Sequence, residues 1–322
     1  MTSGKTLRLG TRGSLLARWQ AEWVASQLRA HGVEVEIVPV LTSGDRNQHW
    51  AVESLGGAGV FTKEIQLALL ANEVDLAVHS MKDLPTQPVP GLAIAAIPKR
   101  GPVGDVLISR TAQTFEQLPS EAIIGTGSRR RAAQILHHRK DLTISPLRGN
   151  LDTRLRKLDS GLYDAIVLAQ AGLERLNITG RMCEPLTPRF LLPAVGQGAL
   201  AVECRLDDEE TRQCLTVLND PISAAEVTAE RSFLRHLEAG CLAPVAAWCR
   251  AVGSSLLLTG RVLSVDGTTK LEVSCLGDIE NPEELGRRVA QLLIAQGAKD
   301  LIRQAKTIPM APPPDAKPDI DD

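Results

Sequence analysis

Aromatic side chains are scarce in this chain of 322 residues, at 3% of the sequence. Proteins that bind single-stranded nucleic acids stack the bases on aromatic rings, and few rings are available here for such a surface. The net charge of −2 also differs from the strongly basic charge of most nucleic-acid-binding proteins. We therefore expect no nucleic-acid partner.

Paired cysteines and long apolar runs are absent as well. No two of the six cysteines form a C-x-x-C pair, so neither a metal site nor a redox pair is indicated. No segment approaches the roughly eighteen uncharged apolar residues of a membrane span, and the N-terminal MTSGKTLRLG lacks the apolar core of a signal peptide. We expect a cytoplasmic protein with free thiols and no membrane contact.

Strand-like and helix-like segments alternate from residue 7 to residue 198, which is typical of an α/β fold. The strand-like ALAVECR follows at 199–205. Closely spaced strands then occupy 244–276 before one closing helix at 281–302, which predicts a small α+β domain. The glycine-rich, polar segment 42–60 is predicted to be a loop, and the proline-rich, acidic segment 309–322 a disordered tail.

Positive charge is concentrated between residues 126 and 157, which carry seven arginines and two lysines against two aspartates. Thr126 and Ser128 end a strand, and Arg130 and Arg131 begin the next helix, where backbone N–H groups favour an anion. Arg148 and Arg154 occupy the same position after the next strand. The carboxyl ends of such strands form the ligand edge of open α/β sheets, and guanidinium forks suit carboxylate or phosphate. The alternative for any one arginine is a solvated helix face, which we expect for Arg129, Arg139 and Lys140.

A carboxylate and a lysine lie at the end of another buried strand, in VDLAVHSMKDLP. Asp83 beside Lys82 could stabilise a developing cation in a cationic pocket, or it could only cap the turn before Pro85. His79 is expected to be a packed, hydrogen-bonded strand residue, because no second ligand stands at metal spacing. Arg12 and Ser14, after the first strand, are expected to face the same cleft.

Seven motifs in this order and spacing resemble the porphobilinogen deaminase family, also called hydroxymethylbilane synthases: GTRGSLLA, AVHSMKDLP, GTGSRRRAAQ, LRGNLDTRL, YDAIVLAQAGLERL, LPAVGQGALAVECR and TAERSFLRHLEAGCLAP. The resemblance runs from about residue 6 to about residue 305. It implies two doubly wound lobes, similar to those of periplasmic binding proteins, and a small α+β domain. The implied boundaries are 1–98 plus 199–218, 99–198, and 219–308, followed by the tail.

The same resemblance implies a transferase that condenses porphobilinogen, its small-molecule substrate, on a dipyrromethane cofactor held by Cys241 through a thioether, the other five cysteines being apolar fillers. Asp83 corresponds to the catalytic aspartate, and Gln197 to a pocket or hinge residue. Carboxylate binding is implied for Arg12, Ser14, Lys82, Thr126, Ser128, Arg130, Arg131, Arg148, Arg154 and Arg175. We expect a monomer.

The chain departs from the family pattern at four positions. Ser54 and Ala58 stand where lysines are common, Gly127 replaces a serine, and Arg129 replaces an apolar residue. A competing interpretation is a binding protein that holds a carboxylated ligand in the same two-lobed cleft without turnover. Such a protein would carry no covalent adduct, whereas the enzyme would carry one and release ammonia.

Overall fold

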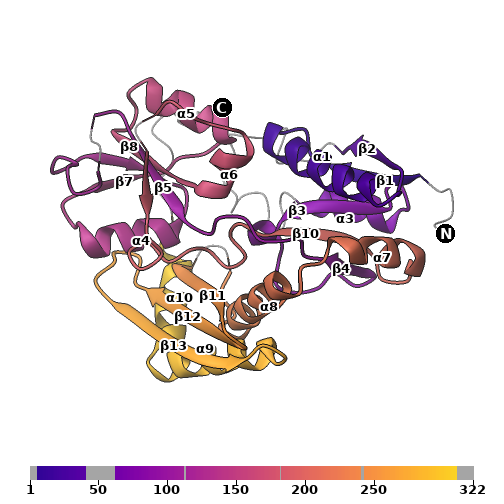
Figure 1. Cartoon of the computed structure of the whole chain (residues 1–322). Coiled ribbons are helices and arrows are strands. Elements are labelled where there is room, and N and C mark those ends of the chain that lie inside the picture. Colours follow the sequence, from indigo (N-terminus) through magenta and orange to yellow (C-terminus); the bar gives the residue numbers. More distant parts are fainter. Residues whose placement is uncertain (1–5, 41–61, 112–113, 182, 241–242, 310–322) are drawn as a thin grey trace, which may run out of the picture.

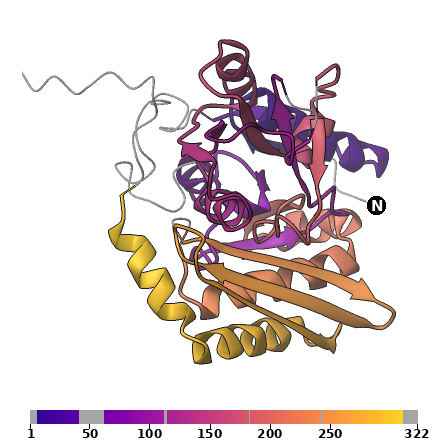
Figure 2. The ribbon, with the colours of Figure 1, turned by 90° about the vertical axis from the view of Figure 1, so that its left-hand side faces the viewer.

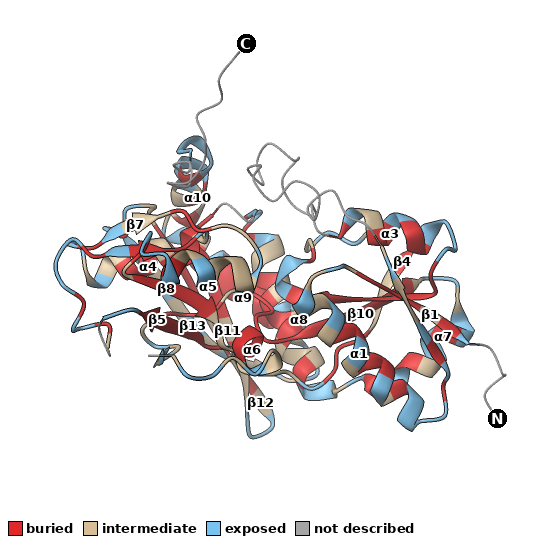
Figure 3. Ribbon diagram, turned by 90° about the horizontal axis from the view of Figure 1, so that it is seen from above, coloured by how far each residue is buried: buried red, intermediate tan, exposed pale blue. Residues whose placement is uncertain are grey.

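Two sheet-and-helix lobes and a smaller third unit make up the computed structural model, which describes residues 6–40, 62–111, 114–181, 183–240 and 243–309. The lobes lie side by side, and the third unit packs below them in the view of Figure 1. The central strands of the two lobes are buried and the outward helix faces are exposed (Figure 3). The predicted fold class is thereby confirmed, whereas the domain boundaries expected from the sequence stay a prediction.

The first lobe is a five-stranded sheet in the order β2 (Val35–Pro39), β1 (Leu7–Thr11), β3 (Leu76–Ser80), β10 (Leu200–Arg205), β4 (Leu92–Ala96). Strand β1 is parallel to β2 and β3, and β10 is antiparallel to its two neighbours. Leu76 and Val78 pack with α1 (Leu15–Ala30), whereas Ala77 packs with α3 (Lys63–Leu70). Because neighbouring residues of a strand face opposite ways, a helix covers each face.

The second lobe repeats this arrangement in the order β7 (Thr143–Ser145), β6 (Ile123–Gly125), β8 (Ala165–Ala169), β5 (Asp105–Ser109), β9 (Cys183–Leu186). Strand β6 is parallel to β7 and β8, and β5 is antiparallel to β8. Helix α4 (Arg129–His138) covers one face and α5 (Leu151–Asp159) the other. The short α6 (Gln170–Arg175) follows β8.

The third unit is an antiparallel sheet of β11 (Val245–Val252), β12 (Ser255–Leu263) and β13 (Lys270–Asp278). Phe233 of α8 (Pro221–His236), Leu258 and Val289 of α9 (Pro282–Ala295) belong to its core. In Figure 2, α9 and α10 (Ala298–Thr307) are the yellow helices beside the orange strands.

The element predictions were wrong in two places. The single closing helix expected at 281–302 is two helices, because Gly297 adopts a left-handed backbone with φ of 98° between α9 and α10. Strands β5 and β9 were missed in the pattern of the sequence. The 42–60 loop and nearly all of the 309–322 tail lie outside the described residues. Helix α7 (Glu209–Leu215) and a 3-10 turn, η2 (Thr216–Leu218), follow β10.

Arg100, between β4 and β5, joins the lobes to the third unit. Its guanidinium makes a bidentate pair with Glu230 of α8 at 2.8 and 3.0 Å, and both side chains are buried. Glu230 also accepts the N–H groups of Gly196 at 2.7 Å and Cys249 at 2.8 Å. The Glu230 carboxylate therefore connects the two segments that pass between the lobes, at Arg100 and at Gly196, with Cys249 of the third sheet.

No helix in the described ranges is long and apolar enough to cross a membrane.

Candidate functional site

A 3-10 turn, η1 (Met81–Asp83), presents Lys82 and Asp83 at the carboxyl end of β3. Met81 and Leu84 are buried at 1% and 7% exposure and anchor the turn on both sides. Lys82 and Asp83 between them are exposed. The apolar anchors thus fix a short turn whose two charged side chains point out of the core.

Electrostatic contacts show that this turn of the first lobe lies close to the arginines of the second. Crowding by the surrounding protein lowers the pKa of the exposed Lys82 to about 8, Asp83 opposes this shift, and Arg131 adds to it. Burial likewise lowers the pKa of Arg154 to about 10, with Arg131 and Arg148 adding and Asp83 opposing. The charged groups of η1 and of the second lobe therefore influence one another electrostatically, with Asp83 as the acidic group among cations.

Arg130 and Arg131 share a buried carboxylate that the sequence reasoning missed, Asp105 at the start of β5. Arg130 Nη2 donates to Asp105 at 2.8 Å, and Arg131 donates from Nη2 at 2.6 Å and from Nε at 3.1 Å. Arg130 Nη1 also donates to the carbonyl oxygen of Leu192 at 2.7 Å, and Arg131 Nη1 donates to that of Val167 at 2.9 Å. Both arginines are nearly fully buried, so Asp105 orients them before any ligand arrives.

Gln197 belongs to the same cluster. Its Nε2 donates to Asp105 at 3.0 Å and to the carbonyl oxygen of Val103 at 2.7 Å. These bonds join the two segments of chain that pass between the lobes. Among the described residues, Gln197 Oε1 and Arg130 Nε are buried without a hydrogen-bond partner. An acceptor and a donor left open at one cluster fit a ligand that has both N–H groups and carboxylates.

The hydroxyl groups of Thr126 and Ser128 shape the start of α4. Thr126 Oγ1 accepts the N–H of Ser128 at 3.2 Å, and Ser128 Oγ accepts the N–H of Arg131 at 3.5 Å as the N-cap of the helix. Such caps are common at helix N-termini. The two hydroxyls thus lie where the sequence predicted, and they organise the arginine-bearing turn.

The prediction that Arg129 is a surface charge is wrong. Arg129 is 5% exposed, and its guanidinium donates to the carbonyl oxygens of Ala305 and Ile308 at the C-terminus of α10. The C-terminal end of α10 therefore accepts hydrogen bonds from a residue that periodicity assigns to solvent. Arg139 and Lys140 lie at the surface as expected, Arg139 in an ion pair with Asp141 at 2.6 Å.

Three further arginines lie around the cleft. Arg148 is half-buried after β7, and Arg154 Nε donates to the carbonyl oxygen of Gly149 at 2.8 Å. Arg175 donates to the carbonyl oxygen of Gly198 at 2.7 Å and lies 5.8 Å from the ring centre of Trp19 in α1. Burial lowers the pKa of Arg175 to about 10. Arg175 therefore bridges the two lobes directly.

Arg12 and Ser14 occupy the equivalent turn between β1 and α1. Ser14 Oγ accepts the N–H of Ala17 at 3.3 Å and caps α1. Arg12 is half-buried beside it. His79 is buried on β3 as predicted, but the predicted hydrogen bond is not found in the described residues, since its Nε2 lies 3.2 Å from Glu203 Oε2 without forming one.

Cys241 lies outside the described residues, but the chain on both sides of it is placed. Ala239, Ala243 and Val195 belong to the same apolar cluster, and the N–H of Ala243 donates to the carbonyl oxygen of Gly240 at 3.1 Å. Val195 directly precedes Gly196 and Gln197, so the described residues on either side of 241–242 share a core with the segment that passes between the lobes.

The other five cysteines are free thiols. Burial raises the pKa of Cys204 to about 11 and also raises that of Cys249, which suppresses the reactive thiolate. Cys214 and Cys275 are partly buried against apolar clusters, in keeping with the expected filler role. Cys183 is exposed on β9, so that role is wrong for this residue.

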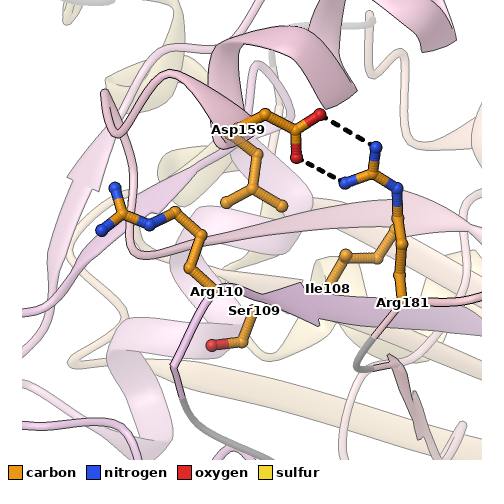
Figure 4. A pocket seen from close by; sticks show the side chains of 6 residues that line it. Ile108, Ser109, Arg110, Asp159 and Arg181 are labelled. Carbon is orange, nitrogen blue, oxygen red and sulfur yellow. Dashed lines mark hydrogen bonds and ion pairs between the residues drawn. The ribbon is translucent and has the colours of Figure 1, made fainter.

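A separate cavity of about 370 Å³ lies at the opposite end of β5 from Asp105 (Figure 4). It is lined by Ile108, Ser109, Arg110, Leu158, Asp159 and Arg181. Arg181 and Asp159 form a bidentate pair at 2.6 and 2.9 Å, and Arg110 points away from them. None of the predicted site residues lines this cavity.

Comparison with known families finds two matches that together span most of the chain. The model described as "Porphobilinogen deaminase, dipyromethane cofactor binding domain" matches residues 7–213, and that described as "Porphobilinogen deaminase, C-terminal domain" matches residues 224–295. Among curated proteins, the porphobilinogen deaminase of Acidothermus cellulolyticus is 48% identical over 304 residues, 93% of this chain and 92% of its own. That of Brevibacillus brevis is 46% identical over 301 residues, 92% of this chain and 96% of its own.

Solved structures give weaker matches. The periplasmic VFT2 domain of Bordetella pertussis BvgS is 16% identical with a TM-score of 0.42, covering 70% of this chain and 92% of that one. The methionine-binding protein MetQ is 12% identical with a TM-score of 0.42, covering 67% of this chain and 91% of that one. Likeness at this level carries no functional argument.

Proposed function

The chain belongs to the porphobilinogen deaminase family, and we propose that its cleft joins four porphobilinogen molecules in turn onto a dipyrromethane primer attached to Cys241. Each addition forms a carbon–carbon bond between the aminomethyl carbon of the incoming ring and the free α-carbon of the chain. Ammonia and the α-proton leave. Hydrolysis then releases the linear tetrapyrrole hydroxymethylbilane.

The observation that carries this proposal is the placement of Asp83 on an anchored, exposed turn within electrostatic reach of Arg154 of the second lobe. Loss of ammonia leaves a cationic, azafulvene-type intermediate on the incoming ring. A fixed carboxylate stabilises that cation and accepts hydrogen bonds from pyrrole N–H groups, which a neutral side chain would do less well. Asp83 is therefore assigned as the catalytic residue.

The surrounding cations would hold the carboxylates of primer and substrate. Each ring has two, so a primer of two rings extended by four carries about twelve, which suits a cleft lined by guanidinium forks. Carboxylate binding is assigned to Arg12, Ser14, Lys82, Thr126, Ser128, Arg130, Arg131, Arg148, Arg154 and Arg175, with Gln197 at the joint. Asp105 restrains Arg130 and Arg131. These two arginines would therefore bind substrate carboxylates through the N–H groups that are not bonded to Asp105.

The cluster at the joint also fits the dipyrromethane. The open Arg130 Nε and Gln197 Oε1 offer a donor for a carboxylate and an acceptor for a pyrrole N–H. When bound, the dipyrromethane supplies the free pyrrole α-carbon to which the first substrate is joined. A thiolate at Cys241 is a suitable soft nucleophile for the thioether. Cytoplasmic location and a monomeric state complete the proposal.

Asp83→Asn tests the catalytic assignment. We expect this variant to fold and to keep its cofactor, as measured by intact mass, but to lose about 10²-fold or more in turnover, because the cation loses its charged partner. Asp159→Asn is the matched control, since this exposed aspartate lines the distant cavity and should leave turnover unchanged. Near-normal turnover of Asp83→Asn with cofactor present would remove Asp83 from the mechanism.

A further inference from the structure

Arg231 of α8 contacts the backbone immediately after the catalytic turn. Its Nη1 donates to the carbonyl oxygen of Leu84 at 3.2 Å, and its Nη2 donates to that of Pro85 at 2.7 Å. The fork therefore spans two consecutive carbonyls that begin one residue after Asp83. A planar guanidinium fixes such a pair more rigidly than a flexible ammonium could.

Arg231 is half-buried, and its guanidinium binds backbone oxygens rather than a carboxylate. Among the described residues Arg231 forms no ion pair, and its donors go to these backbone oxygens instead. Burial lowers the pKa of Arg231 to about 10, with Arg235 adding to the shift and Glu203 opposing it. Because burying a charge without a paired carboxylate is costly, the contact is expected to have a specific purpose.

A buried polar layer in the first lobe supports the same turn. Glu203 of β10 accepts two hydrogen bonds from Gln66 Nε2, each of 3.1 Å, and lies 3.2 Å from His79 on β3. Strand β3 leads directly into η1, so the layer holds the strand while Arg231 holds the exit from the turn. Asp83 lies between these two supports.

The position of Arg231 in the chain adds a second connection. Helix α8 ends at His236, and the chain continues through Gly240 to Cys241, the attachment residue of the proposed function. We infer that Arg231 is a positioning residue, which fixes the Asp83 turn against the helix leading to the cofactor cysteine and so sets where carboxylate and growing chain meet. This inference rests on the proposed function.

The expected consequence is a loss in the chemical step. Displacement of a catalytic group by about 1 Å can cost on the order of 10²-fold in rate, so Arg231→Gln should slow the first ring addition about 10- to 100-fold. The dissociation constant for porphobilinogen should change less. In the described part of the chain, the hydrogen bonds of Arg231 go to none of the side chains proposed to bind substrate carboxylates. Arg231→Lys, which can still donate to a carbonyl, should recover part of the rate.

The experiment follows the first addition by rapid quench and intact mass, counting only molecules that carry the cofactor. Arg139→Gln is the control, because Arg139 also donates to consecutive backbone carbonyls, those of Phe115 and Glu116, but at the outer edge of the second lobe. It should react at the wild-type rate. A wild-type protein that adds no ring would instead refute the proposed function itself.

A double-mutant cycle separates positioning from stability. If Arg231 acts through Asp83, Arg231→Gln should have little further effect on the addition rate in an Asp83→Asn background. Equal losses in both backgrounds would overturn the inference, as would a normal rate for Arg231→Gln with a lowered melting temperature. If Arg231→Gln cannot be isolated with cofactor, Arg231→Lys decides: a slowed first addition supports the inference, and the wild-type rate overturns it.

Discussion

At the scale of single residues, Asp105 decides what Arg130 and Arg131 can do. Burial alone would raise the pKa of Asp105, but the two guanidiniums outweigh it and lower the pKa to about 2. A carboxylate held ionised in this way fixes the orientation of both arginines at the N-terminus of α4. Hydrogen-bond donors that are already oriented lose less side-chain conformational entropy when an anionic ligand binds, which increases the affinity for that ligand.

The Asp105 cluster predicts a specific loss of stability in Asp105→Asn. Breaking a buried ion pair from one side costs about 3–5 kcal/mol, and urea unfolding at pH 7 should show a loss of that size. Asp159→Asn, whose ion pair is exposed, should lose under about 1 kcal/mol.

The same cluster predicts the pH dependence of this difference. Because the folded-state pKa of Asp105 lies near 2, below its ordinary value of 3.8, its stabilisation is complete above about pH 4 and is lost as the pH falls through 2. The gap between wild type and Asp105→Asn in urea unfolding should therefore narrow between pH 4 and pH 2. A gap of constant size across this range would contradict the assignment.

At the scale of elements, α4, which carries Arg130 and Arg131, is joined to the third unit by side-chain hydrogen bonds. Arg261 of β12 donates to Gln134 of α4 and to the carbonyl oxygen of Phe190. The ring of His137 contacts the carbonyl oxygen of Gly267, in the turn between β12 and β13, at 2.8 Å. The helix that presents the arginines is thus supported by a sheet more than a hundred residues away in sequence.

Gly267→Ala tests this support against a matched glycine. Both Gly267 (φ 72°) and Gly253 (φ 60°) occupy left-handed turns of the third unit. Only at Gly267 would a Cβ collide with α4, at 2.6 Å from the backbone nitrogen of His137. Gly253→Ala should cost about 1 kcal/mol from backbone strain alone. Gly267→Ala should cost about 1–3 kcal/mol more, as measured by urea unfolding. Equal costs would mean that the turn does not brace α4.

The elements also show how far the sequence could predict the fold. Alternation and helical periodicity located most strands and helices, and the strand-end rule placed Asp83, Thr126 and Arg148 where the structure has them. Strand β9 escaped because its CEPL is short and contains proline. The burial of Arg129 and the pairing of Asp105 depend on partners at Ala305 and Arg130, and no local pattern encodes contacts over such distances.

At the scale of the whole molecule, the Arg100–Glu230 pair lies where both lobe crossings meet the third unit. Glu230 also accepts the N–H groups of Gly196 and Cys249, so its carboxylate coordinates three separate segments. A chain that grows while tethered at Cys241 requires the lobes to shift or the chain to move through the site at each addition.

Glu230→Gln is expected to lower the free energy of unfolding by about 3–5 kcal/mol, because Arg100 would stay buried without its full counter-charge. Glu226→Gln is the control: Glu226 lies 3.6 Å from the same guanidinium but is less buried, and its loss should cost about 1 kcal/mol or less. Chemical denaturation of both variants measures the difference. Similar small losses would show that the joint does not depend on the Glu230 pair.

The central claim is that Cys241 carries a dipyrromethane primer that grows by one porphobilinogen at a time. The most direct measurement is the intact mass of the denatured protein beside Cys241→Ala, before and after brief exposure to porphobilinogen. The account predicts a wild-type excess of two deaminated porphobilinogen units, which increases by further single units with substrate and is absent from the variant. A wild-type mass equal to that of the bare polypeptide, unchanged after prolonged incubation with substrate, would contradict it.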